Sequence, residues 1–300
     1  MVKSFSELYR ELRGELLETE GAEAAGVARE LLCWASGRNA AEIIASGREL
    51  FADEEMLRRV REAADRVEAG EPLAYVLGEW DFCGMTLTVT PDVLIPRDDT
   101  ACVTEMAIKK VMFLEQNPRV LDLCAGTGCI GLAIAHRVKD ARVTLGELSP
   151  GAIRVAKKNI LDQKLTGRVS CIAVDARKPA PRFLGQFDLI VSNPPYVTAK
   201  EMEELPRSVR DFEPRMALFG GEDGLDFYRD IVKNYTPALK PGGYLCFEFG
   251  RGQEDAVCAV LRGGDYEIVQ LRQDAREITR AVLARLKRED AENGKEQDPL

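Results

Sequence analysis

The chain has 300 residues, of which 45% are hydrophobic and 30% are charged. This is about twice the length of a typical domain and can supply a full-sized core, which excludes collagen-like, fibrous and disordered proteins. The net charge is −9, from 41 basic and 50 acidic residues. Proteins that hold nucleic acid through its phosphates usually carry a basic excess. We therefore expect two globular domains, or one large domain with an appendage, and no stable nucleic acid partner.

Histidine and cysteine usage limits the chemistry. The sequence contains one histidine, His136, and eight cysteines that lie mostly inside apolar runs without a CxxC pair. This pattern favours free thiols in a reducing compartment and excludes histidine-based metal sites and nucleophile triads. The amino terminus has no apolar signal core, and no stretch approaches the roughly eighteen uncharged residues of a membrane span. We expect a cytoplasmic protein with no metal and no membrane partner.

Residues 1–70 show apolar side chains at helical spacing, which predicts a small helical bundle. Two stripes mark its longer helices, one formed by Phe5, Leu8, Tyr9, Leu12 and Leu16 and the other by Leu57, Val60, Ala64 and Val67. Shorter helices are predicted at 22–34 and 40–45. The pattern changes at residues 70–72, and we interpret residues 71–98 as a linker in which two short strands flank a tight turn at Gly84.

Residues 99–288 alternate between helices and strands. After a helix at 99–114, strands are predicted at 120–123, 142–147, 169–174, 187–192 and 244–249, with helices at 128–138, 150–163, 225–239 and 253–263. This alternation predicts an α/β fold with a Rossmann-like doubly wound parallel sheet. The strands at 266–271 and 278–286 have no helix between them, so they should close the sheet as an antiparallel hairpin. Residues 289–300 lack periodicity, and we expect a disordered tail.

A glycine-rich turn follows the first predicted strand. Gly126, Gly128 and Gly131 have GxGxxG spacing, which lets backbone approach a ligand closely at the positive end of a helix. Such turns also occur for packing reasons. Dinucleotide binders place a pyrophosphate here, whereas Asp122 at the strand end suits a cation, such as the α-amino group of a ligand.

Two more acids follow the next strands. Glu147 can accept both hydroxyls of a ribose, although it is also placed to be a charge at a helix amino terminus. Asp175 can reach an adenine amino group, although it is also typical of a solvated loop. Together the three acids indicate S-adenosylmethionine rather than NAD as the cofactor.

The fourth strand leads directly into Asn193-Pro194-Pro195-Tyr196. Two prolines remove two backbone donors and fix φ, so the carbonyl of Pro194 is held rigidly. The side-chain carbonyl of Asn193 adds a second acceptor, and two adjacent acceptors match the hydrogens of a planar NH₂ group. An ordinary rigid turn with Tyr196 in the core is the alternative interpretation.

A delocalised amide or nucleobase nitrogen is too weak an acid for a protein base to deprotonate before it reacts. Acceptors on both hydrogens can orient the nitrogen and stabilise the positive charge that grows as it attacks a methyl carbon. In-line placement contributes several kcal/mol, roughly 7 to 11 in the best intramolecular systems. No general base is needed, and the side chain of Tyr196 can cover one face of the planar group.

Across nearly its whole length the chain resembles the bacterial release factor glutamine methyltransferases. The resemblance rests on the glycine turn and NPPY, and on residues 72–82 (PLAYVLGEWDF), 93–97 (VLIPR), 212–215 (FEPR), 217–221 (ALFGG) and 223–225 (DGL). It implies a class I methyltransferase fold that uses S-adenosylmethionine and yields S-adenosylhomocysteine. The implied substrate is the glutamine of the Gly-Gly-Gln loop in class 1 peptide chain release factors, methylated on its side-chain nitrogen, N5. The helical domain, residues 1–70, is implied to help recognise the release factor.

The motifs and this resemblance together give the predicted site. The cofactor-binding residues are Asp122, Gly126, Thr127, Gly128, Glu147, Asp175, Ala176 and Asn193. The substrate-binding residues are Pro96, Arg97, Asn193, Pro194, Pro195 and Tyr196, of which Asn193, Pro194 and Tyr196 are the predicted catalytic residues. The chain departs from the family pattern at Asp98 and Ala101, where Pro and Glu are usual, at Cys124, where Gly is usual, and at Phe249, where Ile is typical.

Three other functions remain open at this point. NPPY is shared with nucleic acid amino methyltransferases acting on adenine, cytosine or guanine, which the acidic charge disfavours. A cofactor-binding scaffold has no need of NPPY. An NAD oxidoreductase would bind nicotinamide dinucleotide in place of S-adenosylmethionine.

Overall fold

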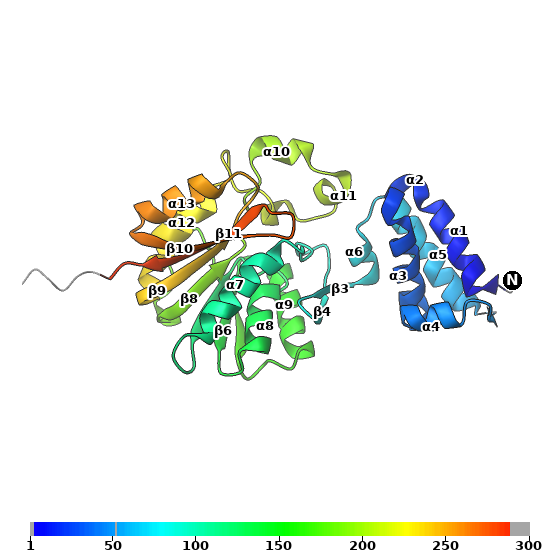
Figure 1. Ribbon diagram of the computed structural model, residues 1–300, viewed down its shortest axis with the longest axis horizontal. Coiled ribbons are helices and arrows are strands. Elements are labelled where there is room, and N and C mark those ends of the chain that lie inside the picture. The colour runs from blue at the N-terminus through cyan, green and yellow to red at the C-terminus, as the bar shows by residue number, and fades with distance from the viewer. Residues whose placement is uncertain (1–2, 52, 289–300) are drawn as a thin grey trace, which may run out of the picture. The chain divides into compact units, whose positions relative to one another are not determined.

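The computed structural model describes residues 3–51 and 53–288 and divides into two compact units. The first comprises the described residues up to Trp80 together with Val89–Pro91 and Leu205–Glu213. The second comprises the rest (Figure 1). The first unit therefore extends past the predicted boundary at residue 70. The expected tail at 289–300 lies outside the described residues.

The first unit is a helical bundle with a short strand pair. Its elements are β1 (Lys3–Ser4), α1 (Phe5–Glu15), α2 (Leu17–Glu20), η1 (Gly21–Glu23), α3 (Ala24–Ser36), α4 (Ala40–Ala45), β2 (Leu50–Phe51), α5 (Glu54–Glu68), α6 (Leu73–Leu77) and, from the later segment, α11 (Arg207–Arg210). Helix α1 begins at Ser4, whose hydroxyl accepts from Glu7 N (3.3 Å) while the Glu7 carboxylate accepts from Ser4 N (2.9 Å). This reciprocal capping box satisfies two amides that the helix itself leaves unpaired.

Most residues of the two predicted apolar stripes are buried in the core of this unit, and Tyr9 and Leu57 pack against it while partly buried. Leu8, Leu12 and Leu16 are fully buried, as is Val60 on α5. The sequence did not predict α6, whose Val76 joins the same core. Because α6 packs there, a segment that we interpreted as linker belongs to the helical unit.

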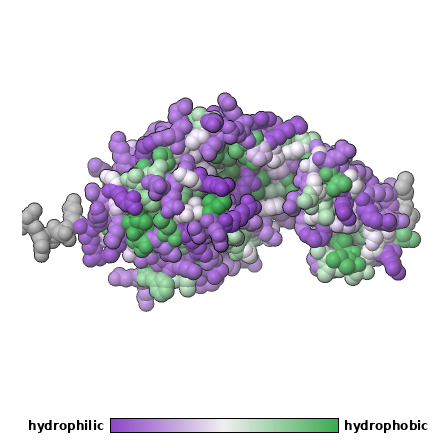
Figure 2. Space-filling view, turned by 45° about the horizontal axis from the view of Figure 1, so that its top comes forward, coloured by the Kyte–Doolittle hydropathy of each residue, from purple (hydrophilic) through white to green (hydrophobic). Residues whose placement is uncertain are grey.

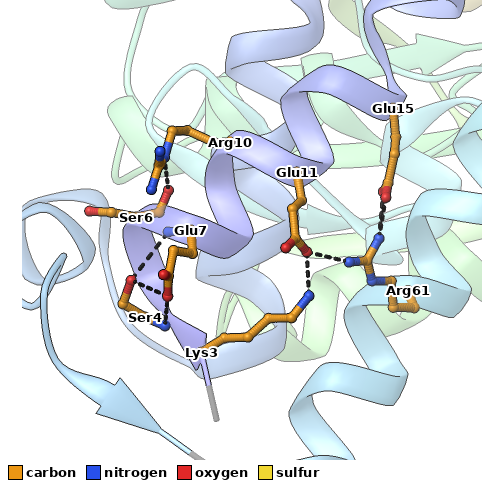
Figure 3. A network of polar contacts seen from close by, with 8 residues as sticks. All are labelled: Lys3, Ser4, Ser6, Glu7, Arg10, Glu11, Glu15 and Arg61. Carbon is orange, nitrogen blue, oxygen red and sulfur yellow. Dashed lines mark hydrogen bonds and ion pairs between the residues drawn. The ribbon is translucent and has the colours of Figure 1, made fainter. Parts of the chain in front are cut away.

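An ion-pair network on the surface joins α1 to α5 (Figure 3). Glu11 accepts from Lys3 and from the Arg61 guanidinium (2.6 Å), which also reaches Glu15 (2.5 Å). The side chains of Glu11, Glu15 and Arg61 are 35–42% exposed. Ion pairs at that exposure contribute little, so the buried stripes rather than these charges hold the bundle together.

The second unit contains a seven-stranded sheet in the order β10-β11-β9-β8-β5-β6-β7. The strands are β5 (Arg119–Leu123), β6 (Arg142–Glu147), β7 (Val169–Ala173), β8 (Phe187–Ser192), β9 (Leu239–Glu248), β10 (Tyr266–Gln273) and β11 (Thr279–Leu286). Strands β5 to β9 pair in parallel, and β11 pairs antiparallel with both β9 and β10. The doubly wound sheet and its terminal antiparallel hairpin are therefore confirmed.

Helices cover both faces of the sheet (Figure 1). One core contains residues of α7 (Thr100–Met112), α8 (Cys129–Arg137) and α9 (Pro150–Asp162), and the other contains residues of α12 (Asp226–Tyr235) and α13 (Glu254–Gly263). Side chains of a strand alternate between these cores, with Val120 in the first and Leu121 and Leu123 in the second. Burial on both faces explains why the strands form nearly continuous apolar runs in the sequence.

The remaining elements are short segments between the strands and helices described above. They are β3 (Glu79–Phe82), β4 (Met85–Thr88), η2 (Arg182–Leu184), α10 (Ala199–Glu204), η3 (Arg215–Ala217) and η4 (Thr236–Ala238). The two short strands predicted around Gly84 are β3 and β4, and the residues between them, Cys83 and Gly84, both have positive φ. Strand β9 begins five residues before the predicted start at Tyr244. The sequence masked this because Pro241, Gly242 and Gly243 are typical of turns.

The surface and the remaining side chains place limits on the chemistry. Figure 2 shows hydrophilic side chains over most of one face, with hydrophobic patches between them. No helix within residues 3–51 and 53–288 is long and apolar enough to cross a bilayer. Within the same residues, no cluster of three His, Cys, Asp or Glu side chains is arranged to hold a metal ion.

Candidate functional site

A cavity of about 560 Å³ lies at the carboxyl ends of the parallel strands, within the size range of small-molecule sites. The chain passes from β5 to β6 and β7 on one side, then returns to β8 and β9 on the other. Such a reversal leaves a crevice at the strand ends, where α/β proteins bind ligands. Segments that follow β5, β6, β7 and β8 line the cavity, together with residues 92–94 and 214–217.

Six of the predicted site residues line this cavity, namely Gly126, Glu147, Asp175, Ala176, Asn193 and Pro195. They come from four separate loops that the sheet brings to one edge. The other predicted residues, Asp122, Thr127, Gly128, Pro194, Tyr196, Pro96 and Arg97, are not among the described residues that line it.

The turn after β5 combines an open approach to the cavity with tight packing beneath. Gly126 has φ +54°, and a Cβ added there would meet no atom within 4 Å. A Cβ on Gly131, by contrast, would lie 2.4 Å from Leu145 Cδ2, and one on Gly128 would lie 2.7 Å from Leu145 Cδ1. The last two glycines therefore let α8 pack against β6, while Gly126 leaves space for a ligand to approach the backbone.

Cys124 starts this turn and lines the cavity with φ +57°. This is the position at which the resemblance described above leads us to expect glycine. The left-handed conformation costs a side-chain-bearing residue about 1–2 kcal/mol, which explains why glycine suits the position. The departure is thus more than the packing change that we expected from the sequence.

Asp122 lies beneath the turn rather than in the cavity. Its side chain is 1% exposed, and Oδ2 accepts from Gly131 N at 2.8 Å. Oδ1 has no partner among the described residues. Burial raises the pKa of this carboxyl to about 7, and the nearby Glu147 charge acts in the same direction. The expected contact with a ligand amine stays a prediction, because in this structure Asp122 faces the start of α8.

Glu147, the last residue of β6, binds three backbone amides. Oε2 accepts from Gly126 N (2.8 Å), and Oε1 accepts from Leu148 N (2.7 Å) and Ser149 N (2.9 Å). A carboxylate has about four lone-pair sites, so about one remains for a ligand. A ribose that donates both hydroxyls would therefore have to share or replace the bond to Gly126.

Asp175 and Ala176 line the cavity after β7. Asp175 Oδ1 accepts from Arg177 N (2.9 Å), and Lys178 Nζ lies 3.6 Å from Oδ2. The backbone carbonyl of Asp175 accepts from the Tyr235 hydroxyl at 3.2 Å. The carboxylate is 22% exposed, so it remains accessible from the cavity.

Asn193 lines the cavity at the end of β8. The preceding Ser192 is fully buried, and its hydroxyl donates to Leu123 O at 2.7 Å, which ties the end of β8 to the end of β5. The Asn193 amide Nδ2 donates to Thr100 Oγ1 at 3.2 Å, at the start of α7. Asn193 is thereby held on the same edge as the glycine turn.

Three glycines hold the NPPY turn from other directions. A Cβ on Gly220 would lie 2.6 Å from Pro195 O, and one on Gly224 would lie 2.3 Å from Tyr196 O. A Cβ on Gly250 would lie 3.0 Å from the Tyr196 ring. Two backbone bonds, Val197 N to Leu218 O and Gly220 N to Val197 O (both 2.9 Å), fix the same strands of chain together. We call Gly220, Gly224 and Gly250 the glycine clamp.

The tyrosine of the turn packs away from the cavity. Tyr196 contacts Gly250 and the second core, and burial raises its pKa well above the ordinary value. The expected stacking of Tyr196 on a planar ligand group stays a prediction. Pro96 is buried and Arg97 is half-buried, and neither is among the described residues that line the cavity.

Sequence reasoning missed several residues of this region. Leu148 and Met216 line the cavity while remaining 49% and 50% exposed, so they form an apolar rim. Neither residue type carries a sequence signal. Glu248 lies close to Asn193 and is 2% exposed. An acid inside the apolar run at the end of β9 was the available signal.

Comparisons with known proteins agree with this architecture. The sequence matches the family described as "Methyltransferase small domain" over residues 104–208 and the one described as "PrmC N-terminal domain" over residues 7–78. It is 42% identical to a release factor glutamine methyltransferase of Geobacter sulfurreducens, over 72% of this chain and 74% of that protein. It is 35% identical to the one of Bradyrhizobium diazoefficiens, over 94% of this chain and 95% of that protein.

A solved structure supports the fold alone. The crystal structure of the hMettl16 catalytic domain in complex with the MAT2A 3′UTR hairpin 6 superposes with a TM-score of 0.53 and 15% sequence identity. The match covers 78% of this chain and 82% of that one. At this identity the likeness extends to the methyltransferase-like sheet and its helices.

Proposed function

Since this chain belongs to the family of release factor glutamine methyltransferases, we propose that it methylates N5 of the glutamine in the Gly-Gly-Gln loop of class 1 peptide chain release factors. The observation that carries the proposal is the position of Asn193, at the end of β8 and on the wall of a cavity shared with Gly126 and Glu147. An amide acceptor thus shares the cavity wall with a turn suited to a nucleoside ligand.

We propose S-adenosylmethionine as the methyl donor, and the residues present fit it. Gly126 leaves open space beside the backbone, Glu147 retains acceptor capacity for a hydroxyl, and Asp175 is accessible for an amino group. When bound, this cofactor supplies a methyl group on a positively charged sulfonium. The carboxylates of Glu147 and Asp175 suit that charge better than the phosphates of a dinucleotide.

The chemistry that we propose for the chain is orientation rather than proton transfer. Asn193 Oδ1 and the carbonyl of Pro194 accept the two hydrogens of the glutamine amide and stabilise the positive charge that develops on its nitrogen. The surplus proton of the methylated nitrogen is then lost to water, so no side chain has to remove it before the attack. Ser192 and the glycine clamp fix these acceptors before the substrate arrives. The exposed Leu148 and Met216 would be covered by the docked loop, which excludes water from the cavity.

The helical unit is proposed to help hold the release factor. This role follows from the family and from its match to the PrmC amino-terminal domain. Its residues 3–51 carry several charged side chains on the surface, and we assign no single one of them as a contact.

The test is mass spectrometry of an intact class 1 release factor after incubation with the purified chain and S-adenosylmethionine. We expect one added methyl group, located by peptide fragmentation on the Gly-Gly-Gln glutamine. A release factor in which that glutamine is replaced by glutamate is the control and should remain unmodified. If DNA or ribosomal RNA became methylated and the release factor did not, the proposal would be refuted.

Asn193→Ala should lower kcat on the release factor by about 10²- to 10³-fold, the loss measured when one oxyanion-hole donor is removed elsewhere. Cofactor affinity, measured by calorimetry, should change far less. If the chain were a scaffold without catalytic function, neither the wild-type chain nor the Asn193→Ala variant would show turnover.

A further inference from the structure

Glu248 is a buried acid whose role the site described above leaves open. It is the last residue of β9, lies between Phe247 and Phe249, and is 2% exposed. Its Oε2 has no hydrogen-bond partner among the described residues. A buried carboxyl that is only partly hydrogen-bonded destabilises a fold, so its presence suggests a function.

Two side chains of the site, those of Thr100 and Asn193, lie close enough to this carboxyl to lower its pKa through hydrogen bonding. The same two residues are bonded to each other, since Asn193 Nδ2 donates to Thr100 Oγ1 at 3.2 Å. Thr100 is the first residue of α7 and is 2% exposed. The three side chains therefore form a closed triangle behind the cavity wall, which we call the Asn193 triangle.

Each hydrogen of the Asn193 amide and of the Thr100 hydroxyl can be assigned an acceptor within the Asn193 triangle. The Asn193 amide has two hydrogens, of which one goes to Thr100 Oγ1, and we assign the other to the nearby Glu248 carboxyl. We also assign the single hydroxyl hydrogen of Thr100 to Glu248, which leaves the Thr100 oxygen free to accept from Asn193. The NH₂ group is thus fully used inside the protein.

This accounting fixes which way the amide faces. The oxygen and nitrogen of an Asn side chain have nearly the same shape, so only the hydrogen-bond partners select one orientation. With acceptors on the inner side, Nδ2 turns inward and Oδ1 is left on the side of the cavity. The flipped amide would place two oxygens against each other and present a donor to a substrate that itself offers two donors.

We propose that Glu248 and Thr100 are positioning residues that hold the Asn193 amide with its oxygen toward the NH₂ group of the substrate. This inference rests on the proposed function, because it concerns the group that accepts the hydrogens of the glutamine amide. It goes beyond that function by assigning a task to two residues outside NPPY.

The surroundings of Glu248 are compatible with this task. Asp99 raises and Arg280 lowers the pKa of its carboxyl, and burial, the largest influence, raises the pKa to about 8. The Tyr196, Tyr228, Cys102 and Cys129 side chains are the other titratable groups that its charge affects. The ionised carboxylate is an acceptor only and therefore selects one orientation of Asn193, whereas the protonated carboxyl also carries a donor that can pair with Oδ1 of a flipped amide. The orientation is therefore held most strictly in the ionised form.

The first test compares Thr100→Val with Thr100→Ser on the intact chain. Valine removes the hydroxyl at nearly constant shape, whereas serine keeps it, so kcat on the release factor should be about tenfold lower for Val than for Ser, as for one lost hydrogen bond. The dissociation constant of S-adenosylmethionine should agree within about twofold between them, since Thr100 does not line the cavity. Equal kcat for the two variants would overturn the inference.

The second test compares Glu248→Gln with Glu248→Met, with melting temperature measured beside kcat. Gln keeps a carbonyl acceptor and Met does not, so kcat should be higher for Gln, although Met removes a buried acid and need not lower the melting temperature. A kcat for Met equal to that for Gln would overturn the inference. Failure of the wild-type chain to methylate the release factor would refute the proposed function instead, so the two failures are distinguishable.

Discussion

Asp122→Asn should make the second unit less sensitive to pH. The Asp122 pKa is raised from 3.8 to about 7 because the side chain is fully enclosed, so the folded state disfavours the ionised form. When folding raises the pKa of an acid, the folded state has its full stability at pH values below the pKa of the unfolded chain. This stability is lost as the pH rises through the pKa of the folded state. The relevant window therefore runs from about pH 4 to about pH 7.

The magnitude follows from the separation of the two pKa values. A rise from 3.8 to about 7 spans about three pH units, and at 1.36 kcal/mol per unit the ionised carboxyl destabilises the fold by about 4 kcal/mol at high pH. Asn keeps the acceptor for Gly131 N and cannot ionise. The variant should thus gain about 2 to 3 kcal/mol over the parent between pH 5 and pH 7.5.

Urea unfolding followed by far-ultraviolet circular dichroism, with hydrogen exchange of β5 peptides, measures this difference. Fluorescence is a useful control, because both tryptophans, Trp34 and Trp80, belong to the first unit. The unfolding transition reported by tryptophan fluorescence should therefore be the same in the parent and in the variant. The reasoning is refuted if parent and variant show the same pH dependence. A variant that loses cofactor affinity instead would restore the expectation that Asp122 faces a ligand amine.

Three further predictions concern other parts of the structure. Gly126→Ala should cost about 1–2 kcal/mol of stability because of its positive φ, and it should also weaken S-adenosylmethionine binding as measured by calorimetry. The control is Gly37→Ala, also at positive φ with nothing within 4 Å, which should cost similar stability and leave binding intact. Equal binding by the two variants would contradict a ligand approach at Gly126. Glu147→Gln should lower the melting temperature and weaken cofactor binding, with a free-energy cost of about 1–3 kcal/mol to stability and to binding, since an amide NH₂ cannot accept from the backbone donors. An unchanged melting temperature would argue against those bonds. Arg61→Ala should cost less than about 1 kcal/mol in chemical denaturation because its ion pairs are exposed, and a larger loss would show that this network contributes more than its exposure indicates.

The sequence predicted the elements with strong periodicity and the cavity side of the sheet. Strand β6 and helix α4 have the predicted bounds, because buried apolar runs and capping residues are local signals. The short helix α6 was missed, since five residues give less than two turns of periodicity. Its formation depends on packing with the helical core, which the local sequence does not encode.

For the site, the sequence predicted which residues lie at the edge of the sheet better than it predicted the direction in which their side chains point. Residues after parallel strands were expected at one edge, and Gly126, Glu147, Asp175 and Asn193 meet there. Asp122 was expected to face the cavity because it lies near the end of a strand. Side chains of a strand alternate between its two faces, however, and the Asp122 carboxylate points to the face covered by α8. Contacts between distant segments, such as Thr100 with Asn193, have no signature in a single sequence.

The glycine clamp has a consequence for how the protein can change. Gly220, Gly224 and Gly250 touch the NPPY turn through space that even a methyl group would fill. In a library of single substitutions, we therefore expect these three glycines to tolerate other residues as poorly as Asn193 does, although they carry no functional group. Altered substrate preference is more accessible at the rim, where Leu148 and Met216 are about half exposed and a different side chain meets solvent rather than packed backbone.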